Sequence, residues 1–232
     1  MKVSIHQPQY LPWLPYFMKI EESDLFILLD TVDFQKNGLQ NRNQIKTAQG
    51  PHWLTVPVKQ KLGQKICDVE INNAVNWRYK HWQTIQQCYK KAAVFKSHEQ
   101  ELNALYLQEW TGLNELNSEL LMLMLRWMNI RTPMIRSSQM MATGNASELV
   151  LNLCLEAKAT VYISGVGGKN YLVPDAFKRA GVEIDYRPSV LPGEYPQLFP
   201  QAGSIAHLSA LDIILNCGSA WRNYIPVEVA LS

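Results

Sequence analysis

Short apolar runs that end in polar residues recur along the chain and predict a parallel sheet. They lie at residues 2–5, 25–29, 132–136, 160–163 and 182–186. Each has the length of a buried strand, and polar or glycine residues follow it. Helical patterns separate these runs, at residues 13–22, 147–157 and 174–180. The alternation predicts an α/β fold of the HUP or Rossmann-like type, with a mostly parallel sheet flanked by helices.

A different pattern interrupts this alternation between the second and third runs. Residues 43–47 and 53–58 alternate apolar and polar side chains around Gly50-Pro51, which is typical of two antiparallel strands. Residues 66–71 alternate in the same way and predict a further strand. We therefore expect a small β-rich insertion at about residues 32–75.

Helical periodicity then dominates, and it predicts a helical middle section at about residues 77–130. The expected helices of this section lie at residues 77–93, 99–110 and 113–128. A last helix is expected near the end of the chain, at residues 208–216. The chain shows no internal repeat and no low-complexity segment. We therefore expect residues 1–232 to form a single domain.

Composition narrows the class of protein. The hydrophobic fraction of 47% is enough for a core, and the net charge of only +2 argues against a nucleic-acid partner. The longest apolar stretch, residues 120–125, is too short to span a membrane, and His6 interrupts the start before a secretory signal can form. The four cysteines are widely spaced, which favours reduced thiols in the cytoplasm and no metal site.

The polar groups that follow the strands define the first candidate site. They include His6, Asp30, Ser137, Ser138 and Ser164. Parallel neighbours end at the same edge of a sheet, where α/β proteins bind their ligands, so we expect these groups to converge. The plain alternative is that any buried strand has to end in something polar.

His6 is the leading catalytic candidate, because histidine titrates near neutrality and can act as a base, an acid or a phosphate ligand. Asp30 can orient it or bind a hydroxyl group. Ser164 is a candidate nucleophile, although no G-x-S-x-G elbow surrounds it. A structural histidine and an ordinary loop cap are the alternatives for His6 and Asp30.

Two further groups fit an anionic ligand such as a nucleotide or another phosphate-bearing donor. Amide and basic side chains gather in the insertion, at Gln35, Lys36, Asn41, Arg42, Asn43 and Lys46. A solvated loop is the alternative for these residues. Gly165, Gly167 and Gly168 precede Lys169 and open backbone amides toward an anion. Their spacing matches neither a P-loop nor a dinucleotide fingerprint, so the sequence names no cofactor.

Taken together, several motifs make the chain resemble the WbqC-like family of bacterial proteins over nearly its whole length. They are His6-Gln7-Pro8-Gln9-Tyr10-Leu11-Pro12-Trp13, Leu29-Asp30, Phe34-Gln35-Lys36, Asn41-Arg42-Asn43, Trp53-Leu54-Thr55-Val56-Pro57-Val58, Lys80-His81, Ser137-Ser138 and Ser164-Gly165-Val166-Gly167-Gly168-Lys169-Asn170-Tyr171-Leu172. The chain departs from the family pattern at Pro15, where glycine is usual, and at Asp33, where glutamine is common.

The resemblance implies a role in bacterial surface polysaccharide, such as the O-antigen of lipopolysaccharide. It suggests acyl or aminoacyl transfer to a nucleotide-linked amino sugar, with His6, Asp30 and Ser164 as catalytic residues. The expected ligand contacts are Gln7, Gln9, Tyr10, Lys19, Gln35, Lys36, Asn41, Arg42, Asn43, Lys46, Trp53, His81, Ser137, Ser138, Gly165, Gly167, Gly168, Lys169 and Tyr171.

Two other functions remain open at this point. A first strand that ends in a His-containing loop is reminiscent of HUP-type nucleotide-binding folds, which favours an adenylate-forming or nucleotidyltransferase-like enzyme. The HxGH signature of those enzymes is absent, because Gln7-Pro8-Gln9 follows His6. The third hypothesis is a non-catalytic module that binds a sugar nucleotide or a partner enzyme of polysaccharide assembly.

Overall fold

A computed structural model describes residues 1–226, and the contacts within it group the chain into two compact units. The first unit consists of Met1–Pro8, Pro15–Val32 and Ile130–Ser189. The second consists of Gln9–Leu14, Asp33–Asn129 and residues 190–226. The single domain expected over residues 1–232 stays a prediction.

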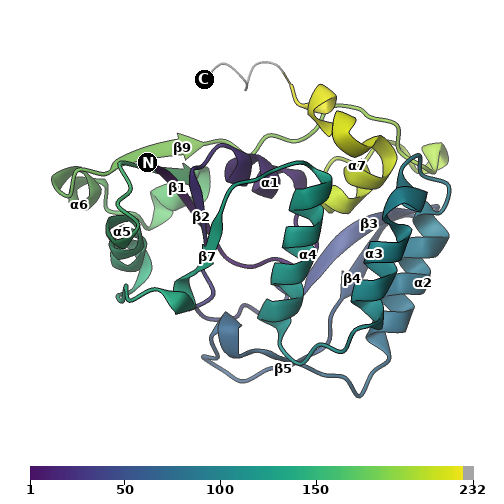
Figure 1. Cartoon of the computed structure of the whole chain (residues 1–232), viewed down its shortest axis with the longest axis horizontal. Coiled ribbons are helices and arrows are strands. Elements are labelled where there is room, and N and C mark those ends of the chain that lie inside the picture. The colour runs from purple at the N-terminus through teal and green to yellow at the C-terminus, as the bar shows by residue number, and fades with distance from the viewer. Residues whose placement is uncertain (227–232) are drawn as a thin grey trace. The chain divides into compact units, whose positions relative to one another are not determined.

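A five-stranded parallel sheet forms the centre of the first unit, which confirms the predicted α/β fold. The strands run in the order β7-β2-β1-β8-β9 across the sheet (Figure 1). Their bounds are β1 Lys2–His6, β2 Leu25–Leu28, β7 Met134–Arg136, β8 Val161–Gly165 and β9 Glu183–Arg187. Each predicted apolar run of this unit therefore became a strand, shifted by at most two residues at either end.

Helices cover both faces of this sheet, as the side-chain alternation requires. Ile27 belongs to a buried cluster with Leu149 and Phe177, which lie on helices α5 (Ala146–Glu156) and α6 (Pro174–Arg179). Its neighbour Phe26 points to the other face and contacts the ring of Tyr16, on helix α1 (Leu14–Glu21), with 5.4 Å between centroids.

The strand order places a topological switch point beside β1. From β1 the chain passes to β2 and then to β7 on one side, whereas β8 and β9 follow on the other side. In open parallel sheets, the crevice at such a point, beyond the carboxyl ends of the strands, is where ligands bind. The fold therefore marks the ends of β1 and β8 as the candidate site of this unit.

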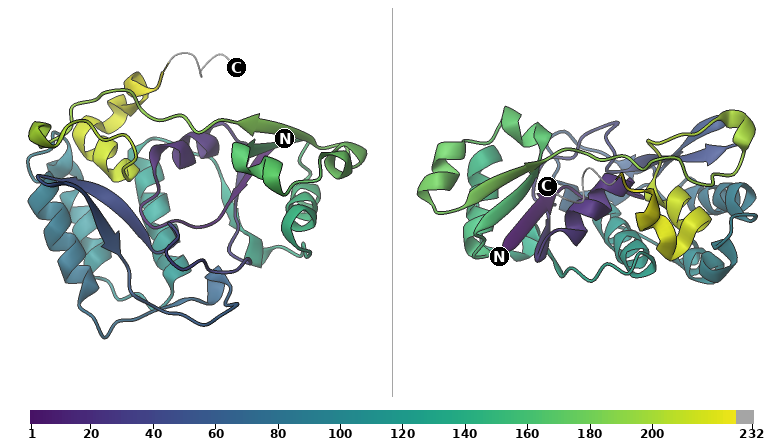
Figure 2. Two further views of the ribbon diagram at one scale, coloured as in Figure 1. Left: turned by 180° about the vertical axis from the view of Figure 1, so that it is seen from behind. Right: turned by 90° about the horizontal axis from the view of Figure 1, so that it is seen from above.

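The second unit contains the predicted β-rich insertion and the helical section. Strands β3 (Arg42–Thr47) and β4 (Gly50–Thr55) pair antiparallel, as do β5 (Val58–Lys59) and β6 (Glu70–Ile71). Four helices complete this unit, namely α2 (Trp77–Tyr89), α3 (Phe95–Leu107), α4 (Leu113–Trp127) and α7 (Ala210–Cys217). Figures 1 and 2 show α2 and α3 side by side.

Several elements of this unit differ from the sequence prediction. Strand β4 runs from Gly50 to Thr55 instead of residues 53–58, and helix α2 ends at Tyr89 instead of residue 93. The strand expected at residues 66–71 is a 3₁₀ turn over Ile66–Asp68 followed by the short strand β6. Ile66 and Val69 are both buried, and a spacing of three residues suits a 3₁₀ turn rather than a strand. Helix α3 begins at Phe95 instead of residue 99, because its polar first turn conceals the periodicity that buried Phe95 starts.

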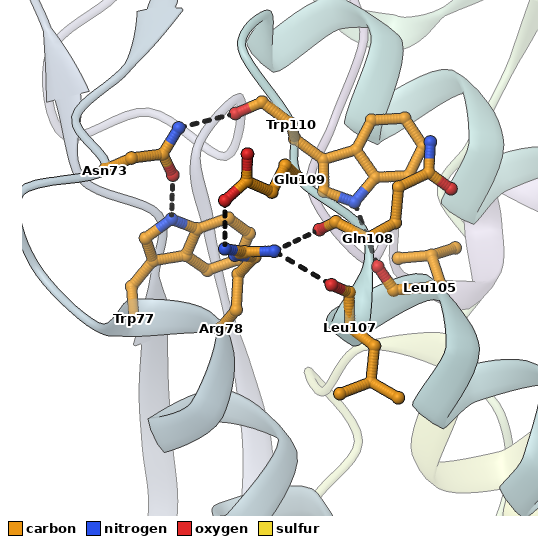
Figure 3. A network of polar contacts seen from close by, with 8 residues as sticks. All are labelled: Asn73, Trp77, Arg78, Leu105, Leu107, Gln108, Glu109 and Trp110. Carbon is orange, nitrogen blue, oxygen red and sulfur yellow. Dashed lines mark hydrogen bonds and ion pairs between the residues drawn. The ribbon is translucent and has the colours of Figure 1, made fainter.

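A polar network ties the start of α2 to the end of α3 (Figure 3). The Arg78 guanidinium donates to the carbonyls of Leu107 and Gln108, at 3.0 and 2.6 Å, which satisfies carbonyls left open at the helix end. The Asn73 amide nitrogen donates to the Trp110 carbonyl at 2.8 Å, and its oxygen accepts from the indole of Trp77 at 3.1 Å. Both ends of this carboxamide are therefore hydrogen-bonded.

Candidate functional site

His6 and the glycine-rich segment lie at the same level of the sheet in the first unit. The strands β1 and β8 are paired with Val3 opposite Tyr162 and Ser4 opposite Ile163. His6 and Gly165 are the last residues of their strands, and each lies two residues beyond the last pair, Ser4 with Ile163. The histidine and the first glycine therefore lie at the same edge of adjacent strands, at the switch point.

The contacts of His6 show which of its ring nitrogens carries the hydrogen. Its Nδ1 lies 3.1 Å from the Gln7 carbonyl, and its ring meets the edge of Tyr16 with 4.8 Å between centroids. Because a carbonyl oxygen can only accept, Nδ1 carries the hydrogen and donates it. In the neutral ring Nε2 therefore keeps its lone pair and can accept a proton or a hydrogen bond.

Burial holds this ring in its neutral form. The pKa of His6 is lowered to about 3, mainly by burial and to a smaller extent by the charge of Lys19. The Lys19 ammonium donates to the Ile5 carbonyl at 2.9 Å, and burial lowers the pKa of Lys19 to about 8. At pH 7 this edge thus presents an uncharged imidazole and a mainly protonated lysine, an arrangement that favours an anion.

The glycine-rich segment folds into a 3₁₀ helix, Val166–Asn170, directly after β8. A side chain at Gly168 would place its Cβ 2.2 Å from the Ser164 hydroxyl and 2.9 Å from Leu172, so only glycine fits there. A Cβ at Gly165 or Gly167 would meet nothing within 4 Å. These two glycines therefore have free space beside their backbone, whereas Gly168 serves the packing of the turn.

The other residues of this segment divide between the interior and the surface. Ser164 is 1% exposed, and its hydroxyl donates to the Gly165 carbonyl at 3.0 Å. Lys169 places its ammonium 5.3 Å from the centre of the Tyr186 ring, and Tyr171 is exposed. The hydrogen bond to Gly165 gives the buried Ser164 hydroxyl a structural role, and its role as a nucleophile stays a prediction.

Asp30, Ser137 and Ser138 come together as the sequence predicted. The fully buried Asp30 carboxylate accepts from the Ser137 hydroxyl at 2.9 Å and from both the backbone amide and the hydroxyl of Ser138, at 2.9 and 2.7 Å. These bonds fasten the end of β2 to the end of β7. They give Asp30 a structural task, and an orienting role toward His6 stays a prediction.

The other predicted ligand residues, apart from Gln7 and Lys19, lie in the second unit. They are Gln9, Tyr10, Gln35, Lys36, Asn41, Arg42, Asn43, Lys46, Trp53 and His81. The structure joins two of them: the Tyr10 hydroxyl lies 2.8 Å from Nδ1 of His81 and 2.6 Å from the Tyr106 hydroxyl. Burial lowers the pKa of His81 to about 4, so this cluster is uncharged at pH 7.

The basic residues of β3 differ in their surroundings. Lys46 is buried and donates to Gln197, at 3.0 Å, and to the Gly203 carbonyl, which holds the segment after Val190 in place. The Arg42 guanidinium lies 4.5 Å over the ring of Trp53, which is 42% exposed. Lys36 and Gln35 are exposed. Arg42 and Trp53 thus form a surface pair, whereas Lys46 has a structural role.

Sequence reasoning missed two buried asparagines, Asn114 and Asn117, on α4. They lie three residues apart on a helix otherwise rich in leucine and methionine, so they share one face. The Asn117 amide donates to the Gln40 carbonyl at 2.8 Å. Two asparagines at this spacing on a buried helix were the available signal, because buried polar groups need a partner.

The fold defines an α/β protein, and its switch-point edge is the candidate ligand site beyond the ends of the central strands. Comparison with known proteins then gives the family: residues 7–224 match the model of the WbqC-like protein family, and the chain belongs to it. The chain is also similar to the uncharacterized protein Rv1507c of Mycobacterium tuberculosis (strain ATCC 25618 / H37Rv), at 33% identity over 227 residues and 97% of each chain. No solved structure matches. Over residues 1–226, none of the helices has the length and apolar character needed to cross a membrane.

Proposed function

We propose that this WbqC-like protein is a transferase that moves an acyl or aminoacyl group to a nucleotide-linked amino sugar, in bacterial surface-polysaccharide synthesis. The observation that carries the proposal is that His6 and Gly165 end the adjacent strands β1 and β8 at the switch point of the sheet. There a group that can accept a proton lies at the same edge as two glycines with free space beside their backbone, and near the positive charge of Lys19. Such a combination suits a phosphate-bearing substrate that loses a proton during reaction.

In the proposed reaction the amine nitrogen of the sugar attacks the carbonyl carbon of the activated acyl group. A carbon–nitrogen bond forms, and the bond from that carbon to the leaving oxygen or sulfur of the donor breaks. Nε2 of His6 takes the proton that the amine loses and passes it to the leaving group. The negative charge of a bound phosphate raises the pKa of His6 from about 3, which makes the ring a better base when the substrate is present.

The test compares binding with turnover in wild type and His6→Gln, a variant that keeps hydrogen bonding but takes no proton. UDP-glucosamine serves as the acceptor probe, thermal shift measures binding, and mass spectrometry follows acyl transfer from a panel of activated acyl and aminoacyl donors. We expect a thermal shift in both proteins, and turnover at least ~100-fold lower in His6→Gln. Unchanged turnover in His6→Gln contradicts the role of His6.

Two outcomes of the same experiment favour the other functions. Binding of UDP-glucosamine without transfer from any donor, equal in wild type and His6→Gln, favours a non-catalytic binding module. A thermal shift with ATP but not with UDP-glucosamine favours an adenylate-forming or nucleotidyltransferase-like enzyme.

A further inference from the structure

Three buried carboxamides of the second unit have oxygens without a hydrogen-bond partner. They belong to Gln9, Asn41 and Asn117, which are 8%, 8% and 1% exposed. A buried polar atom without a partner costs roughly 1–3 kcal/mol, so three in one region call for an explanation.

The segments that carry these three side chains meet at one peptide, Leu39–Gln40, although they come from distant parts of the chain. The backbone amide of Tyr10 donates to the Leu39 carbonyl at 3.0 Å, which brings the neighbouring Gln9 to this peptide. Asn117 donates to the Gln40 carbonyl at 2.8 Å, and Asn41 is the next residue. We call Gln9, Asn41 and Asn117 the carboxamide cluster.

The orientation of two of these amides is fixed by their partners. The amide nitrogen of Asn41 donates to the Val56 carbonyl at 2.9 Å, and that of Asn117 donates to the Gln40 carbonyl. A carbonyl oxygen only accepts, and only the nitrogen of a side-chain amide donates. Exchanging the amide nitrogen and oxygen of either asparagine would therefore break its bond. The oxygens of Asn41 and Asn117 are therefore the atoms that await a donor.

The chain neighbours of Gln9 and Asn41 make contacts of their own. Beside Gln9, the Tyr10 hydroxyl is hydrogen-bonded to His81, which is neutral at pH 7. Arg42 follows Asn41 but points to the opposite face of β3, where it lies over Trp53. The cluster thus offers acceptors without a formal charge.

We propose that the carboxamide cluster binds a primary amino group of a substrate. A protonated primary amine supplies three hydrogens, one for each of the three oxygens, whereas a hydroxyl group supplies one and would leave two acceptors unpaired. The inference concerns a site of the second unit alone. It rests on the proposed function only for the chemical class of the ligand, because amino sugars and aminoacyl groups both carry a primary amine.

The experiment measures Tm of the whole protein with D-glucosamine and with glycinamide. D-glucose and acetamide are the matched compounds that lack the amine. We expect one or both of the amines to raise Tm by about 3–6 °C at ten times Kd, and the amine-free compounds to have no effect. A shift with glucosamine alone identifies the amino sugar as the source, and one with glycinamide alone identifies the aminoacyl donor.

Two variants test whether the Tm shift arises at the carboxamide cluster. Asn117→Leu and Gln9→Met remove single oxygens of the cluster at similar volume, and each is expected to abolish the shift. The control is Asn73→Leu, since Asn73 is a carboxamide of the same unit with both ends hydrogen-bonded (Figure 3). It is expected to lower Tm of the free protein while the amine shift persists, and circular dichroism verifies the fold of each variant.

Two results overturn the inference. The first is no shift with either amine in wild type, which assigns the oxygens to buried water. The second is a shift that survives in both cluster variants. Because binding is measured apart from turnover, amine binding without acyl transfer counts against the proposed function alone, and transfer without an amine shift counts against the cluster alone.

Discussion

The buried carboxylate of Asp30 offers a sharp test of how the end of the sheet is held together. Three hydrogen bonds of 2.7–2.9 Å reach it from Ser137 and Ser138. Asp30→Ala removes all three and leaves the Ser138 amide without its acceptor. Bonds to a charged group contribute ~1.5–3 kcal/mol each and do not add fully, so we expect a loss of about 3–5 kcal/mol in the free energy of unfolding.

Asp30→Asn separates this structural role from a simple loss of charge. The asparagine oxygen keeps the bonds from Ser137 and the Ser138 amide, and its nitrogen donates to the Ser138 hydroxyl, which rotates to accept. Neutral bonds are about half as strong as charged ones, so we expect a loss of only about 1–2 kcal/mol. Asp24→Ala is the control, because the exposed Asp24 accepts one backbone amide, from Lys2 at 2.7 Å.

Urea denaturation of the three variants and wild type measures these differences. A loss below ~1 kcal/mol in Asp30→Ala, or an equal loss in Asp30→Asn and Asp30→Ala, refutes the reasoning. If Asp30→Asn keeps its stability but loses turnover, the orienting role of Asp30 toward His6 gains its first support.

Three further outcomes follow from the structure. Gly168→Ala should lower Tm because its Cβ meets the Ser164 hydroxyl at 2.2 Å, whereas Gly167→Ala, with nothing within 4 Å, should leave Tm within ~2 °C. Since the pKa of His81 is lowered to about 4, the unfolded chain binds its proton first, and stability falls from pH 6.5 toward pH 4 by about 2–3 kcal/mol; urea titrations of His81→Phe should show a weaker dependence. Burial raises the pKa of Cys154 to about 12, so this thiol should react with iodoacetamide in urea but not in the native protein at pH 8, as peptide mass mapping can show.

The sequence predicted the first unit well because its signals are local. Each strand is a short apolar run that stops at a polar residue, and the parallel direction follows from the helices between the runs. The order of the strands was not predictable in this way, since it depends on contacts between distant segments such as β1 and β8. The switch point beside His6 therefore came from the structure.

The candidate site residues also divide into those that local sequence signals predict and those that depend on contacts between distant segments. Asp30 and Ser137 were predictable as neighbours, because both follow parallel strands. Asn117 was not, since nothing in its own helix marks the Gln40 carbonyl as its partner. The role of Lys46 also depends on a distant contact, with Gln197.

An NMR titration of the labelled full chain with UDP-glucosamine tests the central claim most directly. The account predicts amide shifts across Gly165–Lys169 and a rise in the pKa of His6 from its value of about 3, as the nucleotide phosphates approach the ends of β1 and β8. Saturable binding that leaves these amides and the pKa of His6 unchanged, or no binding at all, would contradict it.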